Sequence, residues 1–90
     1  MAGFLFVVAP WRGQGMPTVT RDVWAAAGAA LVWDEGCRVV IVDLKTDKWL
    51  EVDAPHPVSS RDEAHLRRLQ EVLVGELEKA VAALTADRPP

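Results

Sequence analysis

The sequence predicts a small α/β domain with the element order strand, helix, strand, strand, helix. Residues 4–9 and residues 38–44 are apolar at both odd and even positions, which is typical of strands covered on both faces. An alanine-rich segment lies between them, and a helix that connects two such strands predicts a parallel pair. We therefore expect a three-stranded mixed sheet, in which an antiparallel edge strand joins the parallel pair, with two helices.

The composition limits the classes of protein to which this chain can belong. It has 90 residues, of which 50% are apolar, a net charge of −3 and a single cysteine. A disordered chain lacks that much apolar surface, and one cysteine excludes a disulfide framework. The first 50 residues hold five basic and five acidic side chains, and the remainder is acidic. No segment has the basic excess of a nucleic-acid surface, so we expect no duplex binding.

The apolar runs are too short for a membrane protein. No stretch reaches the roughly 20 apolar residues that span a bilayer, and the run at residues 4–9 lacks the basic segment that precedes a signal sequence. A lone cysteine fits a reducing compartment. We expect a cytoplasmic protein without membrane contact, with one domain over residues 1–86 and a disordered tail over residues 87–90.

The first half of the chain contains a strand, a loop and a short helix. The strand ends at Pro10, and glycine and proline residues predict a loop over residues 11–17. Residues 23–33 contain five alanines, which favours a helix capped by Thr18 or Thr20. A buried strand is the alternative for this segment, because it has almost no polar side chain.

The second half contains a hairpin and a long helix. Residues 38–44 form the most strongly β-branched segment, and residues 49–53 alternate between apolar and charged after a short polar turn. A capping box of Ser60 and Glu63 predicts that the last helix begins there and runs to about Thr85. Its apolar stripe, at spacings that average 3.6 residues, is Leu66, Leu69, Leu73, Leu77, Ala80 and Leu84.

The apolar surface indicates an oligomer. The two helices cover both sides of the sheet if one packs on each side; otherwise both lie on one side and a second subunit covers the other. The last helix, at about 39 Å, exceeds the roughly 31 Å diameter of a compact domain of this size. We therefore expect a homodimer or higher oligomer. Exposed tryptophans and the stripe of the last helix supply the candidate interface residues, which are Trp11, Trp49, Leu73, Leu77 and Leu84.

The best candidate for a ligand site is the loop after the first strand. In open α/β sheets, ligands bind at the carboxyl ends of strands, and glycines let backbone N–H groups approach an anion. The order strand, Gly-x-Gly, helix is similar to a dinucleotide-binding fingerprint, but Thr18 stands where a third glycine belongs, so no family is assigned. The candidate ligand-binding residues are Arg12, Gly13, Gln14, Gly15, Asp43 and Lys45.

We expect no catalytic residue, no cofactor and no metal. Cys37 begins a buried strand, where a cysteine is usually a small hydrophobe, and the two histidines lack the spacing of metal ligands. The favoured function is a non-enzymatic assembly protein that self-associates through an apolar sheet face and its last helix and docks a protein partner. The alternative is a domain, or an enzyme built across a dimer, that binds a phosphate, nucleotide or other anion at the glycine loop.

Overall fold

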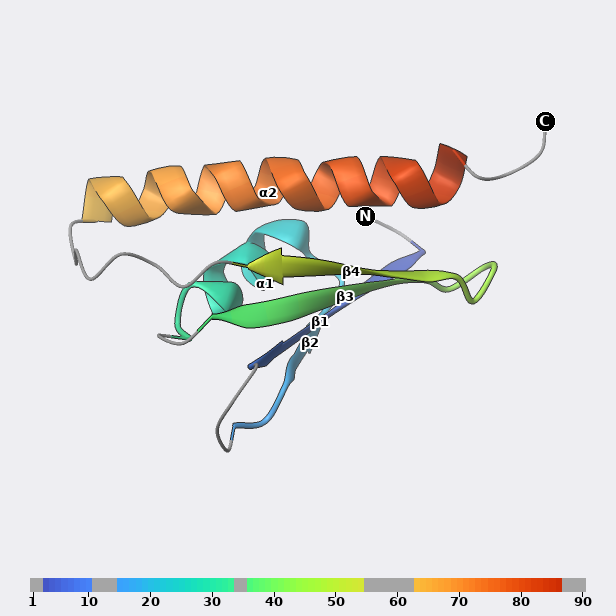
Figure 1. Cartoon of the computed structure of the whole chain (residues 1–90), viewed down its shortest axis with the longest axis horizontal. Coiled ribbons are helices and arrows are strands. Elements are labelled where there is room, and N and C mark those ends of the chain that lie inside the picture. Colours follow the sequence, from blue (N-terminus) through green and yellow to red (C-terminus); the bar gives the residue numbers. More distant parts are fainter. Residues whose placement is uncertain (1–2, 11–14, 34–35, 55–62, 87–90) are drawn as a thin grey trace.

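Two helices lie on one face of a four-stranded sheet in the computed structural model, which describes residues 3–10, 15–33, 36–54 and 63–86 (Figure 1). The molecule measures 45 × 28 × 17 Å, and its long axis follows the last helix. The elements in chain order are β1 (Phe4–Pro10), β2 (Thr18–Thr20), α1 (Val23–Ala30), β3 (Cys37–Asp43), β4 (Trp49–Ala54) and α2 (Glu63–Ala86).

The strand order is β2-β1-β3-β4, and every neighbouring pair is antiparallel. The predicted parallel pair in a three-stranded mixed sheet is therefore wrong. The register of β1 with β3 pairs Phe4 with Asp43 and Pro10 with Cys37, so the two strands run in opposite directions over their whole length. The fold is a small α+β domain with an all-antiparallel sheet.

The difference comes from β2, which the sequence does not reveal. Thr18–Thr20 pairs back on β1, with Phe6 opposite Thr20 and Val8 opposite Thr18, so the chain reverses before α1 begins. Helix α1 does connect two strands of equal direction, but these are β2 and β3, and β1 lies between them. Three residues are too few to show a strand period against the surrounding loop.

Residues 23–30 form a helix and not a buried strand, although α1 ends three residues before Trp33. The N-cap is Asp22, whose Oδ1 accepts a hydrogen bond from the Trp24 amide at 3.0 Å. Thr20, an expected cap, instead ends β2 and accepts a hydrogen bond from the Asp22 amide through its hydroxyl, at 3.1 Å. The carboxylate is thus held where it satisfies a free amide of the first turn.

The core lies between the helices and one face of the sheet. On that face the strands contribute fully buried side chains of Phe6, Val8, Val39 and Ile41. Both helices contact the sheet on this face, which answers the question that the sequence left open. The buried residues of α2 are Leu73, Val74, Leu77, Ala80, Val81 and Leu84.

Helix α2 packs against α1, β3 and β4 of the same chain. Near its start the Gln70 side-chain amide donates to the Trp24 carbonyl at 3.0 Å, and farther along α2 lies over β3 and β4. The expected interface residues Leu73, Leu77 and Leu84 are therefore occupied in the core of the monomer. Within the described ranges, neither helix combines the length and the apolarity needed to cross a membrane.

Candidate functional site

Of the residues expected to bind an anion, the structure describes Gly15, Asp43 and Lys45, and Asp43 and Lys45 lie at the end of β3 away from Pro10. Because β1 and β3 are antiparallel, Pro10 lies opposite the start of β3, while Asp43 lies opposite Phe4 at the other end. The two ends are six residue steps apart along the strands, a distance of about 20 Å. Trp11, Arg12, Gly13 and Gln14 lie outside the described residues.

Asp43 holds the turn between β3 and β4. Its side chain is only 1% exposed, and its Oδ1 accepts a hydrogen bond from the Lys45 amide at 2.9 Å. Its backbone amide donates to the Lys48 carbonyl at 2.8 Å, and its carbonyl accepts from the Asp47 amide at 2.9 Å. Asp47 has a φ of 59°, which places it in the left-handed region. The carboxylate thus fixes a tight turn by binding backbone two residues ahead.

Gly15 makes room for a tryptophan. A Cβ atom at this position would overlap the indole ring of Trp33, whose side chain is half-buried against the core. The absence of a side chain at Gly15 therefore has a packing function: it lets the ring lie directly on the backbone.

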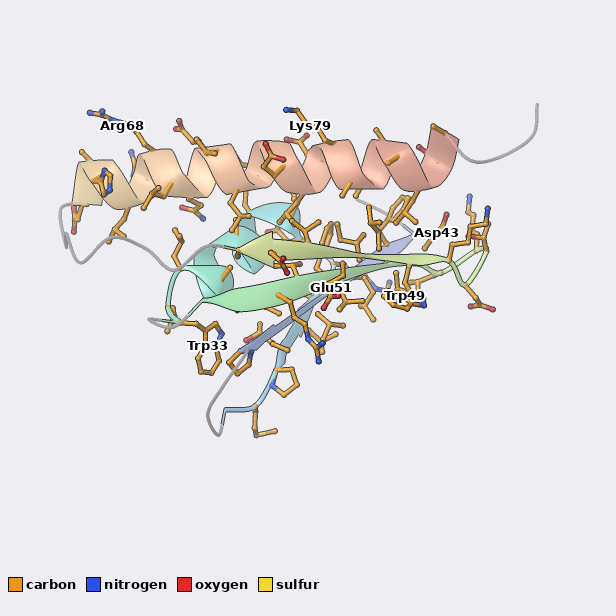
Figure 2. All side chains as sticks on the ribbon, viewed as in Figure 1. Trp33, Asp43, Trp49, Glu51, Arg68 and Lys79 are labelled. Atoms are coloured by element: carbon orange, nitrogen blue, oxygen red, sulfur yellow. The ribbon has the colours of Figure 1, made fainter. Side chains whose placement is uncertain are left out.

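The side of the sheet away from the helices is largely apolar. We call it the open face, and the register shows that its apolar residues are Leu5, Val7, Ala9, Val19, Val40, Val42 and Trp49. Among these, Val19 is 56% exposed and Trp49 is 63% exposed. Figure 2 shows Trp49 and Glu51 on the side of the sheet opposite α2. None of the described elements covers this face.

The open face has an apolar centre and one charged corner. Val7 and Val40 pair across the two middle strands and form the centre. At the corner, the Arg38 Nη1 lies 3.2 Å from the Glu51 Oε1, and Arg38 also stands opposite Asp53 in the register of β3 with β4. The charges are therefore gathered at the β4 side, off the centre of the face.

Strand β4 shows what a solvated outer face looks like in this protein. Its residues alternate, so that Glu51 and Asp53 point to the open face while Val52 points to the helices. In antiparallel sheets with one solvent-exposed face, apolar and polar residues usually alternate in this way along every strand. Strands β1 and β3 depart from that pattern because they are apolar on both faces.

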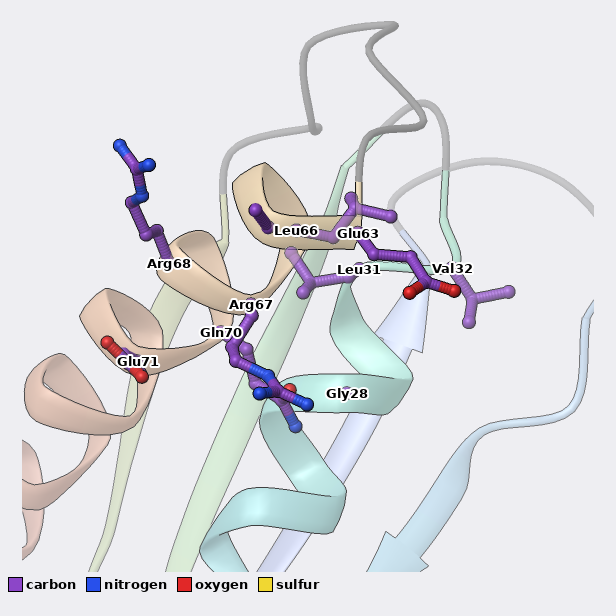
Figure 3. Close-up of a pocket in the computed structure, with 10 residues that line it drawn as sticks. Gly28, Leu31, Val32, Glu63, Leu66, Arg67, Arg68, Gln70 and Glu71 are labelled. Atoms are coloured by element: carbon purple, nitrogen blue, oxygen red, sulfur yellow. The ribbon is translucent and has the colours of Figure 1, made fainter.

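A groove of about 880 Å³ lies between the end of α1 and the start of α2 (Figure 3). Its apolar part includes Leu31 and Leu66, and Gln70 crosses it toward α1 near Gly28. Its charged lining is balanced, with two arginines and two glutamates: Arg67, Arg68, Glu63 and Glu71. The formal charges of these four side chains sum to zero.

Cys37 is a packing residue in this structure. Its side chain is fully buried, and its Sγ donates to the Ala30 carbonyl at 3.6 Å. Burial raises the pKa of the Cys37 thiol above its usual range, because the thiolate loses its hydration there. The thiolate needed for nucleophilic attack is therefore disfavoured. The described part of the chain contains no group of three or more metal-ligating side chains.

Comparisons with known proteins found no similar protein, so the function has to be argued from the geometry of the chain itself. The chain matches no protein-family model, no curated protein sequence and no solved structure. Two features stand out by their chemistry: the apolar open face and the edge of the sheet beside its charged corner.

Proposed function

We propose that this chain is a non-enzymatic assembly protein, which self-associates through the open face and docks a protein partner at a separate surface. The observation that supports self-association is the two-sided apolarity of β1 and β3 beside helices that cover only one side. Contact with a second copy would bury the exposed side chains of Val19 and Trp49 and what remains exposed of the five half-buried apolar side chains of this face. A domain of about 90 residues has a small core, so such burial adds materially to its stability.

The size of the open face suits a weak or moderate dimer. Strands about 4.8 Å apart, with about 3.3 Å per residue, give a flat face of roughly 400 Å². Two copies together then bury roughly 800 Å² of flat area, and the uneven surface of the side chains adds to this value. The total is close to the about 1,000 Å² buried in a specific interface. We therefore expect a homodimer with a dissociation constant of about micromolar magnitude.

The placement of the charges is compatible with a symmetric pair. In a two-fold dimer both copies use the same patch, so the centre of the patch on one copy contacts the centre of the patch on the other. Val7 and Val40 would lie at that centre, while Arg38 and Glu51 would stay at the wet rim. An apolar middle with a polar border is the usual anatomy of a protein interface.

Sedimentation velocity over a series of protein concentrations tests this proposal. We expect a concentration-dependent dimer in the unchanged chain and at least an about 100-fold weaker dimer in Val7→Lys, because Val7 lies between Val19 and Val40 and a buried ammonium without a partner is costly. Val72→Lys is the matched control, since Val72 is 65% exposed on α2. Circular dichroism establishes that both variants are folded.

Two results would contradict self-association. One is a strict monomer at all concentrations up to about 1 mM, which corresponds to negligible binding energy. The other is an equal effect of Val7→Lys and Val72→Lys on the dimer, because only Val7 belongs to the open face.

A further inference from the structure

Strand β4 is one outer edge of the sheet. It runs over six residues, whereas β2 at the opposite edge has three. Trp49, Glu51 and Asp53 of β4 are exposed, and within the described residues no further strand pairs with its outer side. An outer strand of this length presents backbone groups to which another strand can add.

The ladder pattern identifies which backbone groups face outward. The Asp43 amide donates to the Lys48 carbonyl, so this carbonyl points inward to β3. In an antiparallel pair the inward direction alternates from one residue to the next. The N–H and C=O groups of Trp49, Glu51 and Asp53 therefore point away from β3, to the open edge.

A groove lies beside this edge on the helix side. It has a volume of about 580 Å³ and runs between the start of β4 and the end of α2. Leu50 and Leu84 supply its apolar walls, and Ala83 leaves space because its side chain is small. A strand added to β4 would direct the side chain opposite Leu50 toward α2, into this groove. The site thus accepts an apolar residue there.

The other side of the edge is acidic. Glu51 and Asp53 point to the open face. Among the described residues, Arg38 is the basic side chain beside them: it lies opposite Asp53 in the register, and its Nη1 is 3.2 Å from the Glu51 Oε1. An added strand places side chains directly opposite these two carboxylates, where basic residues complement them. Two copies of β4 paired with each other would instead bring acidic residues together, which disfavours self-pairing at this edge.

We propose that β4 docks an extended segment of a protein partner as an additional antiparallel strand, with apolar residues toward α2 and lysines or arginines toward Glu51 and Asp53. The main-chain hydrogen bonds supply affinity, and the alternation of the side chains supplies specificity. This inference rests on the docking part of the proposed function and names its site and the class of its partner. It does not require the open-face dimer.

Fluorescence anisotropy tests the site with a labelled peptide of six residues in total, in which lysine and valine alternate. We expect saturable binding below about 1 mM, and at least about tenfold weaker binding of the alternating glutamate and valine peptide. N-methylation of the lysine amides removes the donors that face β4, and so abolishes binding. N-methylation of the valine amides, which face away from β4, leaves binding intact.

Protein variants test the acidic side of the edge. Asp53→Lys should weaken binding of the basic peptide at least about tenfold, whereas Glu78→Lys makes the same charge change on an exposed position of α2 and should have little effect. The Val7→Lys variant should bind the peptide as the unchanged chain does, because Val7 lies on β1 and β3 separates it from β4. Peptide binding that fails while the dimer persists overturns this inference alone.

Three outcomes would refute docking at β4. They are an absence of saturable binding to the basic peptide, equal binding of both N-methylated peptides, and equal effects of Asp53→Lys and Glu78→Lys. The peptide measurements do not depend on any change to the protein, so they remain decisive even if a variant fails to fold.

Discussion

Replacing Leu77 by alanine tests whether the stripe of α2 belongs to the core of one chain or to an interface. Leu77 is 0% exposed within the monomer, and Leu77→Ala removes three carbon atoms from that enclosed position. Such changes cost about 2–5 kcal/mol, because the cavity left behind closes only in part. At about 2.1 cal/mol/K of unfolding entropy per residue, a loss of about 3 kcal/mol lowers the Tm of this chain by roughly 16 °C.

Urea unfolding followed by circular dichroism measures this loss. Val72→Ala is the matched control on the same helix, where 65% exposure limits the expected change to about 0.5 kcal/mol. Because Leu77 packs within its own chain, the loss should be the same over an about 100-fold range of protein concentration. A loss that fades on dilution would place Leu77 between copies, and a loss below about 1 kcal/mol would refute the burial argument.

Two further changes probe the polar and titratable groups of the fold. Asp43→Ala should destabilise the chain by about 1–3 kcal/mol in urea unfolding, since the Lys45 amide loses its acceptor, while Asp43→Asn keeps an acceptor and should cost less. Burial raises the pKa of the Cys37 thiol, so the linked stability is complete below the pKa of the unfolded thiol and falls as the pH rises through the folded value. Cys37→Ala should flatten this alkaline decline, and an unchanged pH profile would contradict it.

The apolar pattern along the chain is enough to locate most of the elements. Residues 4–9 and 38–44 correspond to β1 and β3, the alternating segment is β4, and the leucine stripe is α2. The direction of β1 relative to β3 could not be predicted, because it depends on β2. Thr18, Val19 and Thr20 pair with β1 through backbone groups that every sequence has, and only Val19 is apolar.

The candidate site was predictable only in part. The parity of Trp49 with Glu51 and Asp53 indicates an exposed tryptophan, and this prediction is confirmed. A carboxylate at the end of a strand has the same sequence signal whether it binds a ligand or its own turn, and Asp43 binds its turn. A leucine stripe likewise does not show whether the apolar surface that it meets belongs to the same chain, as it does at Leu77.

The unequal edges of the sheet have a consequence for how an assembly can grow. The edge at β2 offers only three residues and follows directly on Pro17, which has no amide hydrogen to donate. Short edges and prolines are devices that stop strand-by-strand polymerisation. We therefore expect strand addition at the β4 edge and not at the β2 edge, and at β4 the two carboxylates oppose addition of another copy. An assembly built on these rules ends after a fixed number of chains and does not extend into a fibre.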